Sequence, residues 1–373
     1  MDLKMFFEPV DLEVSKKAGF VQSSIYINTH KMPDHEGMDI ALIGLDEYRG
    51  EGVEAPTSSA RTIRQQLYQL TKGTGDYGIV DLGDLRNGPT HEDTLLRIKE
   101  VGRYLMDKGI IPVYFGGSHD LDVGQFYSYE ETGKLITLLS VDNRIDLEGE
   151  LPYESHHAKI LKHEPNYLFH INHLGYQSYL TNEKSKELLD ELSFESLRLG
   201  ELRKNFTETE PFMRQADMVS FDVASIKSMA GSDASKPFGF TGEEACQLCW
   251  YAGLNEKMSS IGLYGYKDKT DKDKEGAFVL ATMIWYFIEG YYNRKGDKSF
   301  FTNDYLVYDV QVGSTESLKF YKSKLSERWW VEIPKVERGP FNRNRIIACS
   351  YSEYEAALNG EISERWMKFM DKV

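Results

Sequence analysis

Residues 110–120 read IIPVYFGGSHD, an apolar run followed at once by two glycines, a serine, a histidine and an aspartate. The apolar run, Ile110–Phe115, is typical of a strand that is buried on both faces, as in a parallel sheet. Polar residues that directly follow such a strand lie at its carboxyl end, where open α/β sheets form their binding sites. This stretch therefore predicts a parallel α/β sheet with His119 at a candidate functional site.

The alternation of apolar runs and amphipathic stretches continues from about residue 39 to residue 292. We expect further strands at Asp39–Gly44, Gly78–Leu82, Leu135–Val141, Tyr167–Ile171, Met218–Val223 and Ser260–Tyr264. Helical periodicity predicts helices at 60–70, 90–108, 243–253 and 276–292, and Thr90 with Asp93 provides an N-cap signal for the second. Apolar strands separated by helices form a parallel sheet that helices cover on both faces. The sequence thus predicts a three-layer α-β-α fold with a doubly wound, mostly parallel sheet.

The pattern changes near Asn293. Three runs resemble strands joined by polar turns, and two short helices are expected to follow them, at Tyr305–Val312, Leu318–Tyr321, Trp329–Glu332, Glu353–Leu358 and Ser363–Met370. We therefore expect two parts, an α/β domain at 1–292 and a small β-rich appendage at 293–373 that packs on it. Trp329 and Trp330 are expected to pack inside the appendage, and the alternative is that they anchor a protein partner.

The overall composition excludes several classes of partner. The formal net charge is -15, whereas a nucleic acid or an anionic membrane surface requires a basic face. No apolar run approaches the ~20 residues of a membrane span, and the opening MDLKMFFEPV lacks the pattern of a signal peptide. Three cysteines in 373 residues do not form a disulfide framework. We expect a cytoplasmic protein with no nucleic-acid partner and no membrane span.

Two apparent motifs fail because of their context. Gly73–Gly78 spells the dinucleotide-binding fingerprint, but it follows a predicted helix and precedes a strand, which is the reverse of what phosphate binding requires. Cys246 and Cys249 form a Cys-x-x-Cys on a predicted helix with no second pair to complete a zinc site. We expect the two cysteines to be small apolar residues of the core.

Two more predicted strands end in acidic residues. SVDNRID at 140–146 and SFDVA at 220–224 both stand where a strand is expected to end. Alternate residues of an extended chain project to one side, so Asp142, Arg144 and Asp146 should converge. Carboxylates with an imidazole suit Mn²⁺ or a similar divalent cation. Taken singly, each acidic residue could instead cap a helix.

The order and context of these three segments resemble the ureohydrolase family, which includes arginases, agmatinases and formimidoylglutamases. Supporting blocks are Ala55-Pro56 followed by Arg61, Asp81-Leu82-Gly83-Asp84, and Phe240–Ala245. The resemblance covers roughly residues 39 to 292, and the C-terminal appendage is similar to the tail of formimidoylglutamase-like proteins of some bacteria. It implies an arginase-like fold and a pair of manganese ions that hydrolyse linear amidine C–N bonds. It also implies assembly into trimers or larger rings.

The resemblance assigns four metal ligands. In the family, the histidine of Gly-Gly-x-His, the two aspartates of Asp-x-His-x-Asp and the first aspartate of Asp-x-Asp bind one manganese ion. The matching residues are all present, as His119, Asp142, Asp146 and Asp222. If the chain is an enzyme, the resemblance gives catalytic roles to Asp146 and to a proton-shuttle histidine.

Three positions depart from the family pattern. The second manganese ion also requires the central histidine of the first motif and the second aspartate of the other, and here Arg144 and Ala224 occupy those positions. The family's substrate-holding glutamate after the last strand corresponds to Gly265. The proton-shuttle histidine corresponds to His156 or His157 in a loop whose alignment is loose.

Arg144 changes the chemistry of the second metal position. A guanidinium has no lone pair with which to bind a metal, and its fixed charge repels a neighbouring cation. Our hypothesis is that Arg144 takes the place of the second ion and offsets the repulsion among Asp142, Asp146 and Asp222. The alternative is that Arg144 points to solvent and the pocket has simply lost its function. We expect no metal, or one weakly bound Mn²⁺.

Two functions remain open. The first is a catalytically silent or much weakened relative that acts by binding, and the second is an active hydrolase of linear amidines that uses one or two Mn²⁺ ions. The expected partners are a small amidine or carboxylate ligand, a protein that contacts the appendage, and other copies of the chain. A carboxylate is included because the planar guanidinium of Arg144 can donate two parallel hydrogen bonds to one.

Overall fold

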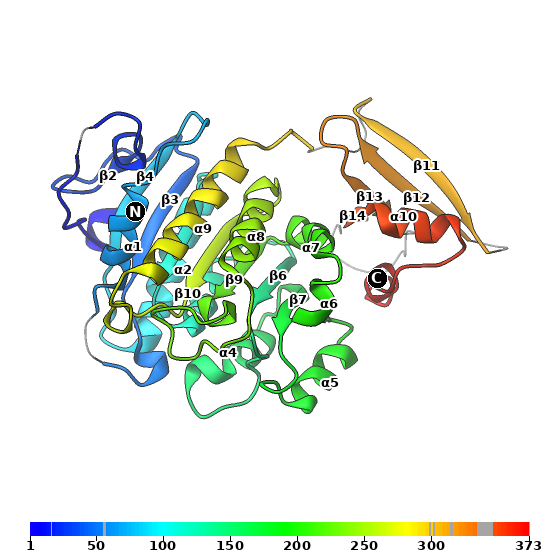
Figure 1. Cartoon of the computed structure of the whole chain (residues 1–373), viewed down its shortest axis with the longest axis horizontal. Helices are drawn as coiled ribbons and strands as arrows, with labels where there is room; N and C mark the ends of the chain where they lie inside the picture. The colour runs from blue at the N-terminus through cyan, green and yellow to red at the C-terminus, as the bar shows by residue number, and fades with distance from the viewer. Residues whose placement is uncertain are drawn as a thin grey trace.

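The computed structural model describes residues 1–15, 17–54, 57–297, 300, 303–313, 316–333 and 346–372. Ala55 and Pro56, which contribute to the resemblance, lie outside these residues. A ten-stranded sheet forms the centre of the main body in the order β1-β4-β3-β5-β10-β9-β6-β7-β8, with β2 paired to β4 (Figure 1). Its strands are β1 (Phe7–Glu8), β2 (Tyr26–Ile27), β3 (Ile40–Leu45), β4 (Ile79–Leu85), β5 (Ile111–Gly116), β6 (Ile136–Val141), β7 (Leu168–Tyr176), β8 (Glu195–Arg198), β9 (Met218–Asp222) and β10 (Ser260–Tyr264).

Helices cover both faces of this sheet, as the sequence predicts. They are α1 (Ser59–Leu67), α2 (His91–Asp107), α3 (Asp122–Tyr127), α4 (Pro152–Leu161), α5 (Glu183–Glu191), α6 (Leu199–Leu202), α7 (Thr209–Gln215), α8 (Gly242–Leu254) and α9 (Glu275–Tyr292). Apolar residues of α1, α6, α7, α8 and α9 pack in one core, and those of α2, α3, α4 and α5 pack in a second. Strand β3 divides its side chains between the two, because Ile40 and Leu42 face the first core and Ala41 and Ile43 face the second. The three-layer α-β-α fold is therefore confirmed.

The strand pairs at the centre of the sheet are parallel, and β1 pairs with β4 in the antiparallel sense. All seven strands predicted in the main body are present to within a few residues. The expected N-cap of α2 is also present, as a capping box between Thr90 and Asp93. The sequence missed β1, β2 and β8, which have two to four residues and too few apolar positions to show a period.

The C-terminal part forms a separate antiparallel sheet in the order β11-β12-β13-β14, at the right of Figure 1. Its elements are β11 (Tyr305–Val312), β12 (Glu316–Ser323), β13 (Trp329–Glu332), β14 (Ile346–Cys349), α10 (Tyr351–Leu358) and α11 (Glu364–Met370). Trp329 and Trp330 are both buried, in two different apolar clusters. The packing interpretation of this pair is thus confirmed, while the sequence missed β14.

Arg214 of α7 joins this sheet to the main body. Its guanidinium donates hydrogen bonds to the carbonyl oxygens of Trp329 (2.9 Å) and Cys349 (3.1 Å) and lies 4.2 Å from the ring centroid of Trp330. Glu210, on the same helix, holds the guanidinium by ion pairing at 2.9 Å. The appendage is therefore fixed to α7 by a buried cation, and not by apolar contact alone.

Neither of the two rejected motifs, Gly73–Gly78 and the Cys-x-x-Cys, has the structural context that ligand binding would require. The segment Gly73–Gly78 lies between α1 and β4, and Cys246 and Cys249 are free thiols buried in the first core. Among the residues that the structure describes, no helix combines the length and the apolar character that crossing a membrane requires.

Candidate metal centre

Three strand ends meet at one edge of the sheet. Strands β5, β10, β9 and β6 are neighbours and parallel, so the segments that follow β5 and β6 and the end of β9 lie side by side. Gly116 and Gly117, at φ of +85° and +72°, turn the chain sharply after β5. A Cβ on Gly116 would lie 2.5 Å from the carbonyl oxygen of Leu45, so this turn requires glycine. The turn delivers His119 to the sheet edge.

The four expected metal ligands come together at this edge. Nδ1 of His119 lies 3.3 Å from Oδ2 of Asp142, 3.9 Å from Oδ2 of Asp146 and 3.6 Å from Oδ2 of Asp222. All four residues are buried. One buried imidazole nitrogen therefore faces three buried carboxylates.

This arrangement fits a divalent cation. Nδ1 of His119 and Oδ2 of Asp142 are buried and have no hydrogen-bond partner among the described residues, which is costly unless another group satisfies them. Three carboxylates with one imidazole form a donor set that suits Mn²⁺ and related ions. His119 also belongs, with Asp142 and Asp146, to one of the groups whose ligand atoms lie close enough together to share an ion.

Without a bound cation, the charges of these carboxylates shift one another's pKa values. Burial and the charge of Asp142 raise the pKa of Asp146 to about 7 and that of Asp222 to about 6. Burial also acts on Asp142, but the neighbouring His119, 3.3 Å away, outweighs it and lowers the pKa of Asp142. A positive charge is needed to keep all three carboxylates ionised.

Arg144 lies against one of these carboxylates. Its Nε forms an ion pair with Oδ1 of Asp146 at 2.7 Å, and its guanidinium lies 4.8 Å from the ring centroid of Tyr153. Burial alone would lower the pKa of Arg144, but the charges of Asp146, Asp142 and Asp222 raise it. The side chain is 26% exposed and lines the cavity above the site. The Arg144 side chain is thus turned toward the carboxylates, and it forms its ion pair with Asp146.

The other two substituted positions supply no carboxylate. Ala224 is buried, and its backbone N–H donates to Oδ1 of Asp222 at 2.8 Å. Gly265 has φ of +86°, and a Cβ there would lie 2.5 Å from Oδ1 of Asp222. This position is therefore shaped for glycine, because a side chain would collide with a candidate ligand and strain the backbone.

The two candidate shuttle histidines lie differently. Nε2 of His156 is 3.3 Å from Oδ2 of Asp146, and its ring centroid is 4.4 Å from that of His119. Burial lowers the pKa of His156, but the carboxylates of Asp122 and Asp146 outweigh it and raise the pKa well above the usual value. The ring centroid of His157 is 6.3 Å from that of His119, and burial lowers its pKa. His156 is the histidine that contacts the carboxylate cluster.

Sequence reasoning missed two residues beneath the site, Asp122 and Ser220. Oγ of Ser220 lies 2.9 Å from Nε2 of His119 and donates to Oδ2 of Asp122, also at 2.9 Å. Oδ1 of Asp122 lies 2.8 Å from Nδ1 of His156. An aspartate at the first turn of a helix resembles an ordinary helix-start residue, so the sequence carries no signal for this contact.

A cavity of about 420 Å³ opens above the site. His119, Asp222 and Gly265 form part of its lining, together with Arg144, Tyr153 and Lys236. Lys267, also on its wall, is held by Glu51 at 2.6 Å and by Asp233 at 3.1 Å. The cavity has the size of a small-molecule site.

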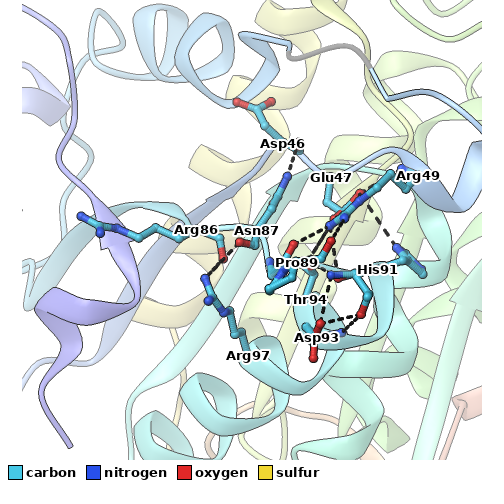
Figure 2. Close-up of polar contacts among 12 residues, drawn as sticks. Asp46, Glu47, Arg49, Arg86, Asn87, Pro89, His91, Asp93, Thr94 and Arg97 are labelled. Carbon is cyan, nitrogen blue, oxygen red and sulfur yellow. Dashed lines mark hydrogen bonds and ion pairs between the residues drawn. The ribbon is translucent and has the colours of Figure 1, made fainter.

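A second polar network runs from the site toward α2, and Figure 2 shows most of it. His91 Nε2 lies 2.5 Å from Oδ2 of Asp120, the residue after His119, and Nδ1 lies 3.9 Å from Oε1 of Glu47. Arg49 binds the Glu47 carboxylate through Nε at 2.9 Å and donates to the carbonyl oxygen of Pro89 at 2.8 Å. Burial lowers the pKa of His91, but Asp120 and Glu47 outweigh it and raise the pKa to about 9. A protonated His91 therefore links the loop after β3 to the turn that carries His119.

Comparison with known proteins agrees with this fold. Residues 39–289 match the arginase family, which is two thirds of the chain, and the chain therefore belongs to that family. The appendage lies outside the matched region. No curated protein matches the sequence.

Solved structures with the same fold include several ureohydrolases. A formiminoglutamase from Trypanosoma cruzi, solved with Mn²⁺, is 18% identical with a TM-score of 0.64, over 70% of this chain and 96% of its own. A formimidoylglutamase from Bacillus subtilis is 16% identical with a TM-score of 0.64, over 78% of this chain and 98% of its own. A hypothetical agmatinase from Burkholderia thailandensis is 14% identical with a TM-score of 0.60, over 74% of this chain and 91% of its own. Identities this low establish the shared fold.

Proposed function

We propose that this protein is an arginase-family member, nearest the formimidoylglutamase-like branch, that binds at most one divalent cation and has lost or greatly weakened two-metal amidine hydrolysis. It acts instead by binding a small ligand in the cavity above the site. The observation that carries this proposal is the contact of Arg144 with Asp146, at 2.7 Å, beside positions 224 and 265, which carry no carboxylate.

The physical reason is the chemistry of a two-metal site. Such a site holds its ions ~3.5–4 Å apart, and each ion needs lone pairs from the protein. Arg144 offers none and adds a positive charge, while the methyl group of Ala224 offers none either. The guanidinium also satisfies part of the carboxylate charge that would otherwise attract a second ion. A second cation would therefore have fewer ligands and an unfavourable neighbour.

One ion still has a full set of ligands. His119, Asp142, Asp146 and Asp222 would hold it, and a bound divalent ion lowers the pKa of a water molecule attached to it. The chain itself contributes His156, which holds a proton between Asp122 and Asp146, and Arg144, which holds Asp146 on the cavity side. We propose that Arg144 limits the affinity of this ion, because its charge remains close by.

The ligand we favour is a small carboxylate. Arg144 and Lys236 both line the cavity, and a guanidinium presents a planar fork that matches a carboxylate. The lost glutamate position, Gly265, removes the negative charge that would attract a cationic amidine. A thermal-shift series with small dicarboxylates tests this, with Arg144→Gln as the variant that should abolish any shift. No shift with any of them in the unmodified protein would exclude this ligand class.

The second candidate function is an active formimidoylglutamase-type hydrolase of linear amidines that uses one or two Mn²⁺ ions. It is favoured by the unsatisfied Nδ1 of His119 opposite three carboxylates. The formimidoylglutamases of similar fold also support it as an alternative.

One experiment separates the two functions. Manganese is counted by elemental analysis after loading and dialysis, and ammonia or formamide release from N-formimidoyl-glutamate is measured on the same samples. We expect no more than one ion per chain and no turnover for the unmodified protein. The Arg144→His/Ala224→Asp variant should bind more manganese, whereas Arg144→Lys should not. Gly265 is left unchanged, because its φ of +86° would strain a glutamate. Two ions per chain or rapid turnover in the unmodified protein would overturn the proposal.

A further inference from the structure

We propose that Asp122 is a positioning residue that fixes the protonation pattern of two histidines at once, and so keeps Nδ1 of His119 free to bind a cation. The inference rests on the proposed single-cation site, although its first measurement needs no metal. Asp122 is fully buried, outside the four-ligand set, between His119 and His156.

The direction of the hydrogen bonds carries the argument. An ionised carboxylate only accepts hydrogen bonds, so the single hydroxyl proton of Ser220 must point to Oδ2 of Asp122, 2.9 Å away. Oγ of Ser220 then has only lone pairs to offer to Nε2 of His119, at 2.9 Å. Nε2 must therefore carry a proton. In a neutral imidazole this leaves the lone pair on Nδ1, the atom that faces the three carboxylates.

The same carboxylate orients the second histidine. Oδ1 of Asp122 lies 2.8 Å from Nδ1 of His156, which must carry a proton because the carboxylate cannot donate one. His156 then turns Nε2 toward Oδ2 of Asp146 at 3.3 Å. Asp122 thus accepts a hydrogen bond at each oxygen. Oδ1 fixes which nitrogen of His156 carries a proton, and Oδ2 does the same for His119 through Ser220.

The geometry also indicates which face of His119 would bind the ion. Nε2 of His119, Nδ1 of His156 and both oxygens of Asp122 already have hydrogen-bond partners. Nδ1 of His119, on the other side of the ring, has none among the described residues. Although His119, Asp122 and His156 lie close enough to share an ion, that side of the ring is already satisfied.

Asp122→Asn gives a sharp test, because an amide of the same shape cannot accept on both sides. If its NH₂ group faces Ser220, the hydroxyl proton turns to His119 and the His119 proton moves to Nδ1. If the NH₂ group faces His156, that ring must accept at Nδ1 and carry its proton on Nε2. Either orientation removes one of the two hydrogen bonds that the carboxylate accepts, and we therefore expect one of the two imidazoles to change its protonated nitrogen.

Imidazole ¹⁵N chemical shifts of the metal-free protein, followed with rising pH until each ring is neutral, report these protons directly, with His119→Gln and His156→Gln used to assign the signals. In the unmodified protein we expect a proton on Nε2 of His119 and on Nδ1 of His156. In Asp122→Asn one of the two rings should change its protonated nitrogen. A neutral His119 with its proton on Nδ1, or an Asp122→Asn spectrum with both rings unchanged, would overturn the proposal.

Manganese binding by calorimetry is the second measurement. Groups that orient a metal ligand typically contribute about 10–100-fold to affinity, and we expect a weakening of about tenfold or more in Asp122→Asn. Ser220→Ala removes the acceptor of the His119 proton and should weaken binding even if Asp122→Asn does not fold.

The matched control is Asp271→Asn, another buried aspartate, which accepts from Tyr266 Oη (2.8 Å) and the Ala277 N–H (2.9 Å) and, in the part of the chain that the structure describes, has no hydrogen bond to His156 or the four candidate ligands. It should leave the histidine spectra and manganese affinity unchanged. Equal weakening in the control would show that the effect is structural. If the unmodified protein binds no manganese, the proposed cation site fails while the ¹⁵N spectra still decide the role of Asp122.

Discussion

Nε of Arg144 lies 2.7 Å from Oδ1 of Asp146, so a permanently charged side chain is paired with a carboxylate that the family resemblance assigns to a metal ion. The other oxygen of Asp146 faces Nδ1 of His119 at 3.9 Å and Nε2 of His156 at 3.3 Å. One carboxylate is thus shared between a guanidinium and the candidate cation position. The balance between these two partners should control metal affinity.

Replacing Arg144 by a neutral residue should shift that balance. We expect Arg144→Gln to bind Mn²⁺ about tenfold more tightly. At a partly buried site, the repulsion between a unit positive charge and an ion a few ångströms away weakens ion binding by on the order of 1 kcal/mol or more. Titration calorimetry measures the change. Arg144→Lys retains the charge and serves as the control, and an unchanged affinity in Arg144→Gln would show that the guanidinium does not act on the ion.

Gly265 should be intolerant of even a methyl group. Gly265→Ala places a Cβ 2.5 Å from Oδ1 of Asp222 at φ of +86°, and we expect a loss of about 1–3 kcal/mol of unfolding free energy with weaker Mn²⁺ binding. Gly296→Ala is the matched control, because Gly296 has φ of +85° and no atom within 4 Å of its Cβ position. Denaturant unfolding of both variants separates the backbone strain from the contact with Asp222. Equal losses would mean that the contact has no effect.

His91 should make stability depend on pH. Its pKa is raised from 6.5 in the unfolded chain to about 9 in the folded protein, because Asp120 and Glu47 outweigh the cost of burial. The folded state therefore holds more protons between these values. The stability that the ion pairs contribute is complete below pH 6.5 and is lost as pH rises through 9. Thermal unfolding of His91→Gln should show a flatter profile across this window, and an unchanged slope would contradict the assignment.

Arg214 should be needed to fix the appendage. Arg214→Ala leaves the carbonyl oxygens of Trp329 and Cys349 without their donor, and we expect a loss of about 3 kcal/mol of unfolding free energy. Tryptophan fluorescence should change as well, because the guanidinium lies 4.2 Å from the ring centroid of Trp330. Arg198→Ala, at an ion pair of 3.8 Å with a half-exposed arginine, should cost ~1 kcal/mol or less. Similar losses in the two variants would contradict a special role for Arg214.

The sequence by itself determined seven strands of the central sheet, four of the nine helices that cover it in the described part of the chain (α1, α2, α8 and α9) and the four residues that gather at the sheet edge. Runs such as Ile110–Phe115 are apolar throughout because both faces of the strand are buried, and this leaves a clear signal in one dimension. The carboxyl ends of parallel strands lie at one edge, so His119, Asp142 and Asp222 were expected at the same edge, while the strand order β5-β10-β9-β6 that makes them neighbours came from the structure. Strands β1, β2 and β8 were missed because a strand of two to four residues is too short to show an alternation of apolar and polar residues.

Only the tertiary structure decided how that edge is organised. The contact between Ser220 and Asp122 joins residues 98 apart in the chain, and Gly265 is constrained by a carboxylate on a different strand. The direction of the Arg144 side chain likewise depends on Asp146 and Tyr153 after the loop has folded. Hydrogen-bond direction and backbone strain depend on three-dimensional neighbours, and no local pattern of residue types records them.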